Sequence, residues 1–200
     1  MVKLQSFLHH NLLEAGLDEA GRGCYAGPVV AAFVILPKDY SHPVLNDSKQ
    51  LSAKKREELR KEIEREAIDF AVAEVCNETI DKINILNASF LAMHKALDQR
   101  KTEPEYLLID GNRFRPYNNI PYECVVEGDG KFYSIAAASV LAKTRRDELM
   151  RKLALTHPEY DWENNMGYGT LKHREAILEF GLTPYHRRSF NLVKNQLELF

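Results

Sequence analysis

Carboxylates stand next to glycines at three points of the chain. Asp18 and Glu19 end a short apolar stretch and run into a turn rich in glycine. Asp110 follows the apolar residues 106–109, and Asp129 lies between two glycines. Carboxylate oxygens are the ligands that Mg²⁺ and Mn²⁺ prefer beside substrate phosphates, and two such ions about 3.5–4 Å apart can drive phosphodiester hydrolysis. The pattern therefore indicates a divalent-metal site for phosphate chemistry.

The same residues have other interpretations when they are taken one at a time. Acids and glycines are common where a strand passes into a turn, and most acids in soluble proteins are exposed. Gly21, Gly23 and Ala26 also match the dinucleotide-binding pattern G-x-G-x-x-G/A, but that pattern must open a helix. Here the β-branched residues 29–36 follow, which are typical of a strand. The context excludes a dinucleotide fold, and no G-x-x-x-x-G-K-[ST] phosphate loop is present in the sequence.

The elements that must position these acids can be predicted from hydrophobic patterning. Strands are expected over residues 12–18, 28–36, 68–76, 106–109 and 122–126. Helices are expected over residues 52–67 (with Ser52 as N-cap), 87–99, 134–154 and 170–180. The small residues at the start of the 134–154 helix predict that it packs closely against another element. Strands that alternate with helices, followed by a helical C-terminal third, predict an α/β domain with a mixed sheet.

Eight short motifs follow one another between residues 18 and 190. They are DEAGRG (18–23), GPVVAA (27–32), NDSKQLS (46–52), LIDGN (108–112), GD (128–129), SIAAASVLAKTRRD (134–147), GYGT (167–170) and HRRSF (186–190). In this order they resemble the bacterial ribonuclease HII family, the type 2 ribonucleases H. The resemblance implies a ribonuclease H-like α/β fold, in which helices flank a mixed β-sheet and the C-terminal part is helical.

The activity implied by this resemblance is endonucleolytic. The family hydrolyses the RNA strand of RNA–DNA hybrids and cuts 5′ of single ribonucleotides embedded in duplex DNA, leaving 3′-hydroxyl and 5′-phosphate ends. Carried over to this chain, the resemblance makes Asp18, Glu19, Asp110 and Asp129 the catalytic carboxylates, which would bind two Mg²⁺ or Mn²⁺ ions.

The adjacent pair Asp18 and Glu19 raises a geometric question. Successive side chains of a strand point to opposite faces, so both cannot reach one ion from a regular strand. We expect the turn at Gly21 to begin early enough to rotate Glu19, or Glu19 to act through its backbone carbonyl or a water. Asp147 is an alternative candidate for the fourth metal-binding carboxylate, but Lys143 lies four residues before it. A structural i, i+4 ion pair is the preferred interpretation.

Substrate recognition is also implied by the resemblance. The loop Gly21-Arg22-Gly23 would read the ribose 2′-hydroxyl through backbone groups, because glycines let the backbone approach closely. Tyr168 would pack on the sugar next to the RNA–DNA junction, although its spacing alone fits an aromatic that fills a gap. Solvated surface charge is the alternative for the residues that resemble phosphate contacts, which are Lys49, His186, Arg187 and Arg188.

The charge pattern and the tail suggest partners. The net charge is −2, yet residues 131–152 carry six Lys or Arg against two acids, so local patches could hold duplex phosphates. The last five residues resemble the peptide Gln-Leu-x-Leu-Phe, with which bacterial proteins dock on the sliding clamp. A terminal turn that folds back on the domain is the alternative. The anchors of the docking peptide would be Gln196, Leu197, Leu199 and Phe200.

Length and composition bound the remaining expectations. The 200 residues, 44% hydrophobic, suit one catalytic domain over residues 1–190, helical from about residue 156, and a tail over 191–200. No apolar run approaches the ~20 residues of a membrane span, and no secretory signal is recognisable. Three scattered cysteines fit a reducing compartment. We therefore expect a cytoplasmic monomer with no membrane association.

Two other functions remain open at this point. One is a different two-metal nuclease of ribonuclease H-like fold, such as an exonuclease, which would have no use for the Gly21-Arg22-Gly23 loop or for Tyr168. The other is an inactive module that binds nucleic acid or the clamp. Loss of a carboxylate would mark the inactive module, and all four acids are present.

Overall fold

The computed structural model describes residues 4–45 and 51–192. Its strands are β1 (Glu14–Ala20), β2 (Val29–Ile35), β3 (Asp69–Val75), β4 (Tyr106–Asp110) and β5 (Tyr122–Val125). Its helices are α1 (Ala53–Glu66), α2 (Asn77–Ile83), α3 (Ile85–Leu97), α4 (Tyr133–Thr156), α5 (Trp162–Asn165) and α6 (Leu171–Phe180). Two single turns of 3₁₀ helix, η2 (Gly128–Gly130) and η3 (Pro158–Tyr160), complete the elements.

The five strands form one mixed sheet in the order β3-β2-β1-β4-β5. Strand β2 is antiparallel to β1 and β3, whereas β4 is parallel to both β1 and β5. The predicted α/β fold with a mixed sheet is therefore confirmed. Because β1 and β4 are parallel neighbours, the residues at their C-terminal ends meet at one edge of the sheet.

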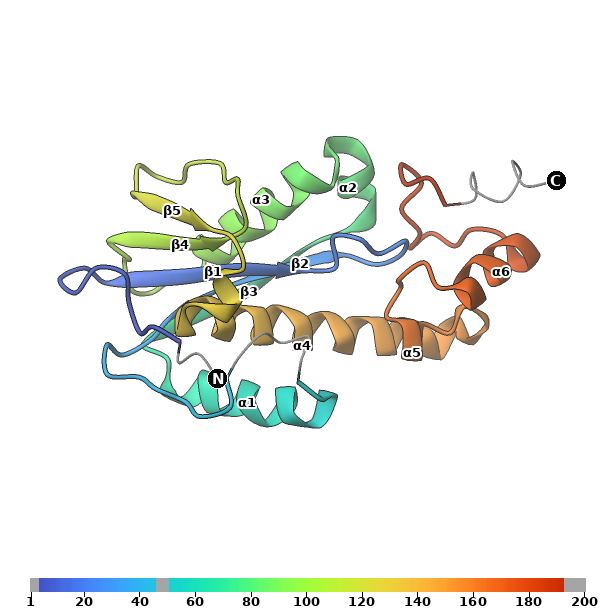
Figure 1. The fold of residues 1–200 in the computed structure, drawn as a ribbon. Coiled ribbons are helices and arrows are strands. Elements are labelled where there is room, and N and C mark those ends of the chain that lie inside the picture. Colours follow the sequence, from blue (N-terminus) through green and yellow to red (C-terminus); the bar gives the residue numbers. More distant parts are fainter. Residues whose placement is uncertain (1–3, 46–50, 193–200) are drawn as a thin grey trace.

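Helices cover both faces of the sheet (Figure 1). Helices α2 and α3 lie on one face, and the long helix α4 runs along the other, with α1 packed against α4. Helix α4 extends past the end of the sheet, where α5 and α6 gather around its C-terminal half. The chain thus has a sheet-bearing part and a helical C-terminal part that share one helix.

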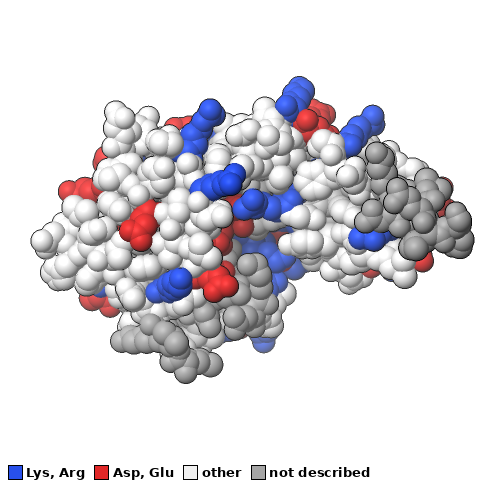
Figure 2. All heavy atoms as spheres, turned by 45° about the horizontal axis from the view of Figure 1, so that its top comes forward, with Lys and Arg blue, Asp and Glu red and all other residues white. Residues whose placement is uncertain are grey.

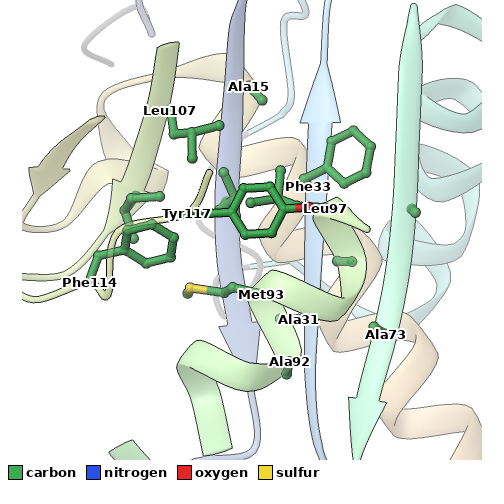
Figure 3. Close-up of a cluster of buried hydrophobic side chains, with 14 of the residues drawn as sticks. Ala15, Ala31, Phe33, Ala73, Ala92, Met93, Leu97, Leu107, Phe114 and Tyr117 are labelled. Carbon is green, nitrogen blue, oxygen red and sulfur yellow. The ribbon is translucent and has the colours of Figure 1, made fainter. Parts of the chain in front are cut away.

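The α3 face is sealed by large apolar side chains. Figure 3 shows Met93 and Leu97 of α3 lying over the strands near Phe33, with Phe114 and Tyr117 from the segment after β4 beside them. Burial of each such side chain contributes about 1.5–3 kcal/mol to folding. This packing holds β1 and β4 rigidly at their positions in the sheet.

The α4 face is closed by small residues instead. The first turns of α4 bury Ala136, Ala137 and Ala138, which lets the helix approach the sheet closely, as predicted. The approach is closest at Gly16 of β1, where a β-carbon would overlap the backbone of Ser134. This contact fixes the start of α4 against the strand that carries the first two acids.

The predicted elements are present, but several bounds differ and the short helices α2 and α5 were not predicted. Strand β1 runs to Ala20 rather than ending at residue 18, because its pairing with β2 continues to Val30. After α2, helix α3 begins two residues early, at Ile85. Asn84, with φ 65°, separates the two helices and caps α3 by accepting from Asn87 N–H. Among the described residues, no helix is both long and apolar enough to span a membrane.

Candidate active site

The register of the two parallel strands brings Asp18 and Asp110 together. Leu17 of β1 pairs with Ile109 of β4, and both side chains belong to the core on the α3 face. The next residue on each strand points to the opposite face, toward α4. Asp18 and Asp110 therefore lie on neighbouring strands and on the same face, where α4 passes.

Asp18 lies in a strongly negative environment. Burial and then the negative charges of Glu19 and Asp110 raise the pKa of Asp18 well above its ordinary value. Hydrogen bonds from the Ser139 side chain and from Glu19 N–H (2.6 Å) act in the opposite direction. Since three carboxylates repel one another here, a bound divalent cation would stabilise all of them. The donor set fits a hard metal ion.

Glu19 remains part of the regular strand. It pairs with Ala31 of β2, and the ladder continues beyond it to Ala20. The expectation that the Gly21 turn begins early enough to rotate Glu19 is therefore wrong, which leaves the alternative that Glu19 acts through its backbone carbonyl or a water. The Glu19 side chain is nearly buried, and its Oε1 accepts a hydrogen bond from Arg22 Nη1 at 3.1 Å.

Asp129 is carried to the site by a turn that contacts Asp110. Gly128 N–H donates to Asp110 Oδ1 at 2.8 Å, and the Asp129 side chain is buried on η2. Within residues 4–45 and 51–192, no three His, Cys, Asp or Glu side chains converge into a complete metal-ligand group. Protein side chains alone therefore do not complete a metal site among these residues, and a bound Mg²⁺ would need waters or substrate phosphates as further ligands.

Asp147 lies in a different environment from the four acids. Its carboxylate accepts from Lys143 Nζ at 2.7 Å and from Arg56 Nη2 at 3.3 Å, and it is buried. The predicted Lys143–Asp147 pair is confirmed. Two cations neutralise Asp147, which makes it part of the contact between α4 and α1.

The loop that follows β1 is fixed by arginines from distant segments. Arg187 donates to the carbonyl oxygens of Arg22 (2.8 Å), Gly27 (3.0 Å) and Pro28 (3.1 Å). Arg146 of α4 donates to the carbonyl oxygens of Ala26, Pro28 and Met166. Arg22 and Gly23, at the tip of the loop, are exposed.

The structure corrects two of the expected phosphate contacts. The Arg187 side chain is 0% exposed and its guanidinium is used by backbone carbonyls, so it cannot reach a phosphate at the surface. His186 is 1% exposed and lies in a buried cluster with His173 and Trp162. Arg188 is exposed, and its N–H donates to Asp81. Lys49 lies outside the described residues, as do Gln196, Leu197, Leu199 and Phe200 of the expected docking peptide.

Tyr168 lies beside the loop after β1, although 147 residues separate it from Gly21. Gly167 C=O accepts from Tyr25 N–H at 2.7 Å, and Tyr168 forms an isolated β-bridge with Cys24. A β-carbon on Gly167, which has φ +79°, would collide with Ala26, so the glycine is needed for this contact. Tyr168 is 44% exposed, which makes it available to a ligand.

Acidic and basic side chains lie close together on one face of the molecule. Figure 2 shows Lys or Arg and Asp or Glu side chains next to each other in a depression near the middle of this face, with further Lys and Arg around it. Basic side chains on a surface attract the phosphates of a duplex. Sequence reasoning missed Ser139 and Arg146, because the first lies in a run of small helix residues and the second in a basic stretch.

Comparison with known proteins gives the family. The family model described as Ribonuclease HII matches residues 15–193. A ribonuclease HII of Bacteroides fragilis is 62% identical over 198 residues, which are 98% of each chain. A ribonuclease HII of Cytophaga hutchinsonii is 60% identical over 200 residues, covering 100% of this chain and 99% of its own.

Solved structures agree on the fold. Ribonuclease H2 of Pyrococcus horikoshii superposes with a TM-score of 0.78 at 24% identity, covering 91% of this chain and 95% of its own. Ribonuclease HII of Archaeoglobus fulgidus, solved in complex with PCNA, gives 0.71 at 26% identity, covering 94% and 100%. Bst-RNase HIII, solved with Mn²⁺, gives 0.72 at 21% identity, covering 94% of this chain and 70% of its own.

Three observations agree on the family. They are the sheet that brings the acids together, the family match over nearly the whole chain and the relatives that align over nearly their full length. This chain belongs to the ribonuclease HII family, the endoribonucleases that cleave RNA in RNA–DNA hybrids.

Proposed function

We propose that this enzyme also cuts duplex DNA on the 5′ side of a single embedded ribonucleotide, by two-metal-ion catalysis. The observation that carries the mechanism is the parallel pairing of β1 with β4, which places Asp18 and Asp110 on the same face of the sheet beside the turn of Asp129. Asp18, Asp110 and Asp129 would hold two Mg²⁺ or Mn²⁺ ions, and Glu19 would act on them through its backbone carbonyl or a water. The bound ions would activate a water and stabilise the leaving oxygen. The Mn²⁺ in Bst-RNase HIII supports a divalent ion.

The protein's own part in this proposal is to hold the carboxylates in place. Asp110 is fixed by Gly128 N–H, and Asp18 by Ser139 and Glu19 N–H, so neither needs to reorganise when ions and substrate arrive. Groups that are oriented in advance lower the barrier because they do not pay for reorientation during the reaction. Cleavage by this mechanism would leave 3′-hydroxyl and 5′-phosphate ends.

Recognition of the ribonucleotide is assigned to the exposed loop tip and to Tyr168. The backbone of Gly21-Arg22-Gly23 would contact the 2′-hydroxyl, which is the group that distinguishes RNA from DNA. The ring of the exposed Tyr168 would pack on the neighbouring sugar. Arg188 at the surface and Lys49 are proposed as phosphate contacts.

A labelled DNA duplex with one internal ribonucleotide tests this proposal. We expect a single cut 5′ of the ribonucleotide with Mg²⁺ or Mn²⁺, no cut with EDTA, and no cut in an all-DNA duplex. Ladders that start from the ends of both duplexes would instead indicate a different two-metal nuclease. Absence of any cut would indicate a module that binds without catalysis.

The C-terminal tail is proposed to dock on the sliding clamp. The complex of Archaeoglobus fulgidus ribonuclease HII with PCNA supports a clamp partner in this family. A pull-down with the bacterial clamp should retain the full chain and lose the chain that lacks residues 196–200. Equal retention of both would contradict the assignment. The chain is further proposed to act in the cytoplasm as a monomer, with one catalytic domain over residues 1–190.

A further inference from the structure

The loop that would read the ribose is held by two arginines that no solvent reaches. Arg146 and Arg187 are each 0% exposed, and together they donate six hydrogen bonds to backbone carbonyls of residues 22–28 and 166. Neither guanidinium makes an ion pair with an acid in the part of the chain that the structure describes. Two buried cations without an ion-pair partner are costly to bury, and a simple surface turn does not need them.

One of these six contacts determines where an amide points. Arg187 Nη1 donates to the carbonyl oxygen of Arg22 at 2.8 Å, so this carbonyl is directed into the protein. The peptide that joins Arg22 to Gly23 is trans, and in a trans peptide C=O and N–H point in opposite directions. The N–H of Gly23 is therefore directed outward.

The surroundings of Gly23 agree with an outward amide. Gly23 is exposed, and a β-carbon built on it meets no heavy atom within 4 Å. Within the described residues, no acceptor receives the Gly23 N–H. The loop tip thus presents a free donor at a place without a side chain, which a ribose oxygen can approach.

We propose that Arg187 is a positioning residue for ribose recognition: it holds the Arg22 carbonyl inward so that Gly23 N–H can donate to the 2′-oxygen. The inference rests on the proposed recognition of a ribonucleotide by this loop. Burial lowers the pKa of Arg187 to about 10, so its guanidinium stays protonated at neutral pH and keeps all three carbonyls bound. Arg187 itself never touches the substrate.

The test compares two arginine-to-lysine variants. Arg187→Lys keeps the charge but cannot reach three carbonyls with one ammonium group. Arg100→Lys is the control, because Arg100 also donates to a backbone carbonyl, that of Leu97, and contacts none of the residues of the site. Affinities are measured in EDTA for a duplex with one ribonucleotide and for the same duplex as all DNA, together with the melting temperature of each variant.

For Arg187→Lys we expect the preference for the ribonucleotide duplex to fall at least fivefold, with all-DNA affinity within twofold of wild type. Arg100→Lys should keep the preference. If Arg187→Lys prefers the ribonucleotide duplex as strongly as wild type does, whatever its melting temperature, the positioning role of Arg187 is overturned. The proposed recognition of the ribonucleotide by the loop would still stand. A wild-type enzyme that binds both duplexes equally would overturn the ribose-reading loop, and the inference with it.

A second measurement, which does not need Arg187→Lys to fold, tests the Gly23 donor that the proposal requires. In ¹⁵N-labelled wild-type protein, the Gly23 amide resonance should shift when the ribonucleotide duplex is added and stay in place with the all-DNA duplex. The same response to both duplexes, or none to either, would overturn the proposal.

Discussion

The Arg146 side chain occupies the space that a β-carbon on Gly21 would need. Gly21 also has φ +95°, which only glycine adopts without strain. Two positions later, Gly23 faces open space and has no positive φ. The two glycines of one motif therefore serve different purposes: Gly21 allows the loop to pack on α4, and Gly23 leaves its outer side free.

Alanine at these two glycines should separate stability from activity. Gly21→Ala should lower the free energy of unfolding by at least ~1 kcal/mol, because of backbone strain and the overlap with Arg146. Gly23→Ala should change it by less than ~0.5 kcal/mol. Its methyl group would nevertheless stand between the amide and the ribose, and kcat/KM on a single ribonucleotide should fall about tenfold. Urea denaturation and steady-state cleavage check both, and a fully active Gly23→Ala enzyme would contradict the model of the loop.

Replacement of Tyr168 tests its contact with the sugar. Because Tyr168 is 44% exposed, Tyr168→Ala should change the melting temperature little while reducing single-ribonucleotide cleavage about tenfold, the equivalent of a ~1.4 kcal/mol contact. Tyr168→Phe keeps the ring and loses only the hydroxyl that contacts the Cys24 side chain, so most activity should remain. Unchanged kinetics for Tyr168→Ala would give this residue a structural role only.

Stability should depend on pH through the buried histidines. Burial, with the nearby His173 and His157, lowers the pKa of His186 to about 4, below the value of 6.5 in an unfolded chain. Between these values the unfolded state binds more protons than the folded state. The contribution of neutral His186 to the free energy of unfolding is therefore complete above pH 6.5 and is lost as pH falls toward 4. Burial lowers the pKa of His173 as well, which acts in the same direction.

The expected loss for His186 alone is up to about 3 kcal/mol across this window. Urea denaturation at pH 7 and pH 5 should show about 2 kcal/mol of this loss. His186→Gln should flatten the dependence, whereas substitution of the exposed His10 by Gln should leave it as in wild type. An enzyme equally stable at both pH values would contradict the neutral histidine cluster.

Replacement of Asp147 should lower stability but not activity. Asp147→Asn removes the partner of Lys143 and Arg56 and should destabilise the contact between α4 and α1 by about 1–3 kcal/mol. Since both cations already neutralise this acid, cleavage by the folded variant should stay within a fewfold of wild type. Loss of all activity without loss of stability would place Asp147 among the metal ligands.

Local pattern predicted most of the fold, because each strand and helix carries its own periodicity. It also placed Asp18 and Asp110 at strand ends, and the parallel pairing of β1 with β4 then brings them together. What could not be predicted depends on contacts between distant segments. Nothing in the sequence around Arg187 shows whether its side chain is buried against backbone carbonyls or exposed for contact with a phosphate. The backbone conformation at Glu19 could not be predicted either, because it depends on the pairing of β1 with β2, which keeps the strand regular to Ala20.

In the proposed mechanism, the carboxylates at the C-terminal ends of β1 and β4 drive metal-dependent cleavage. The most direct test is single-turnover cleavage of the ribonucleotide duplex by Asp110→Asn, with substrate binding measured in parallel. Asp69→Asn is the control, because Asp69 is also a buried acid but binds the N–H groups of Lys101 and Thr102, remote from the acids. We predict that Asp110→Asn, and equally Asp18→Asn, cleaves at least ~10³-fold more slowly than wild type, a loss of roughly 4 kcal/mol of transition-state stabilisation, with affinity nearly unchanged. The Asp69→Asn enzyme should cleave at the wild-type rate. Wild-type cleavage by either Asp18→Asn or Asp110→Asn would contradict the assignment of this site.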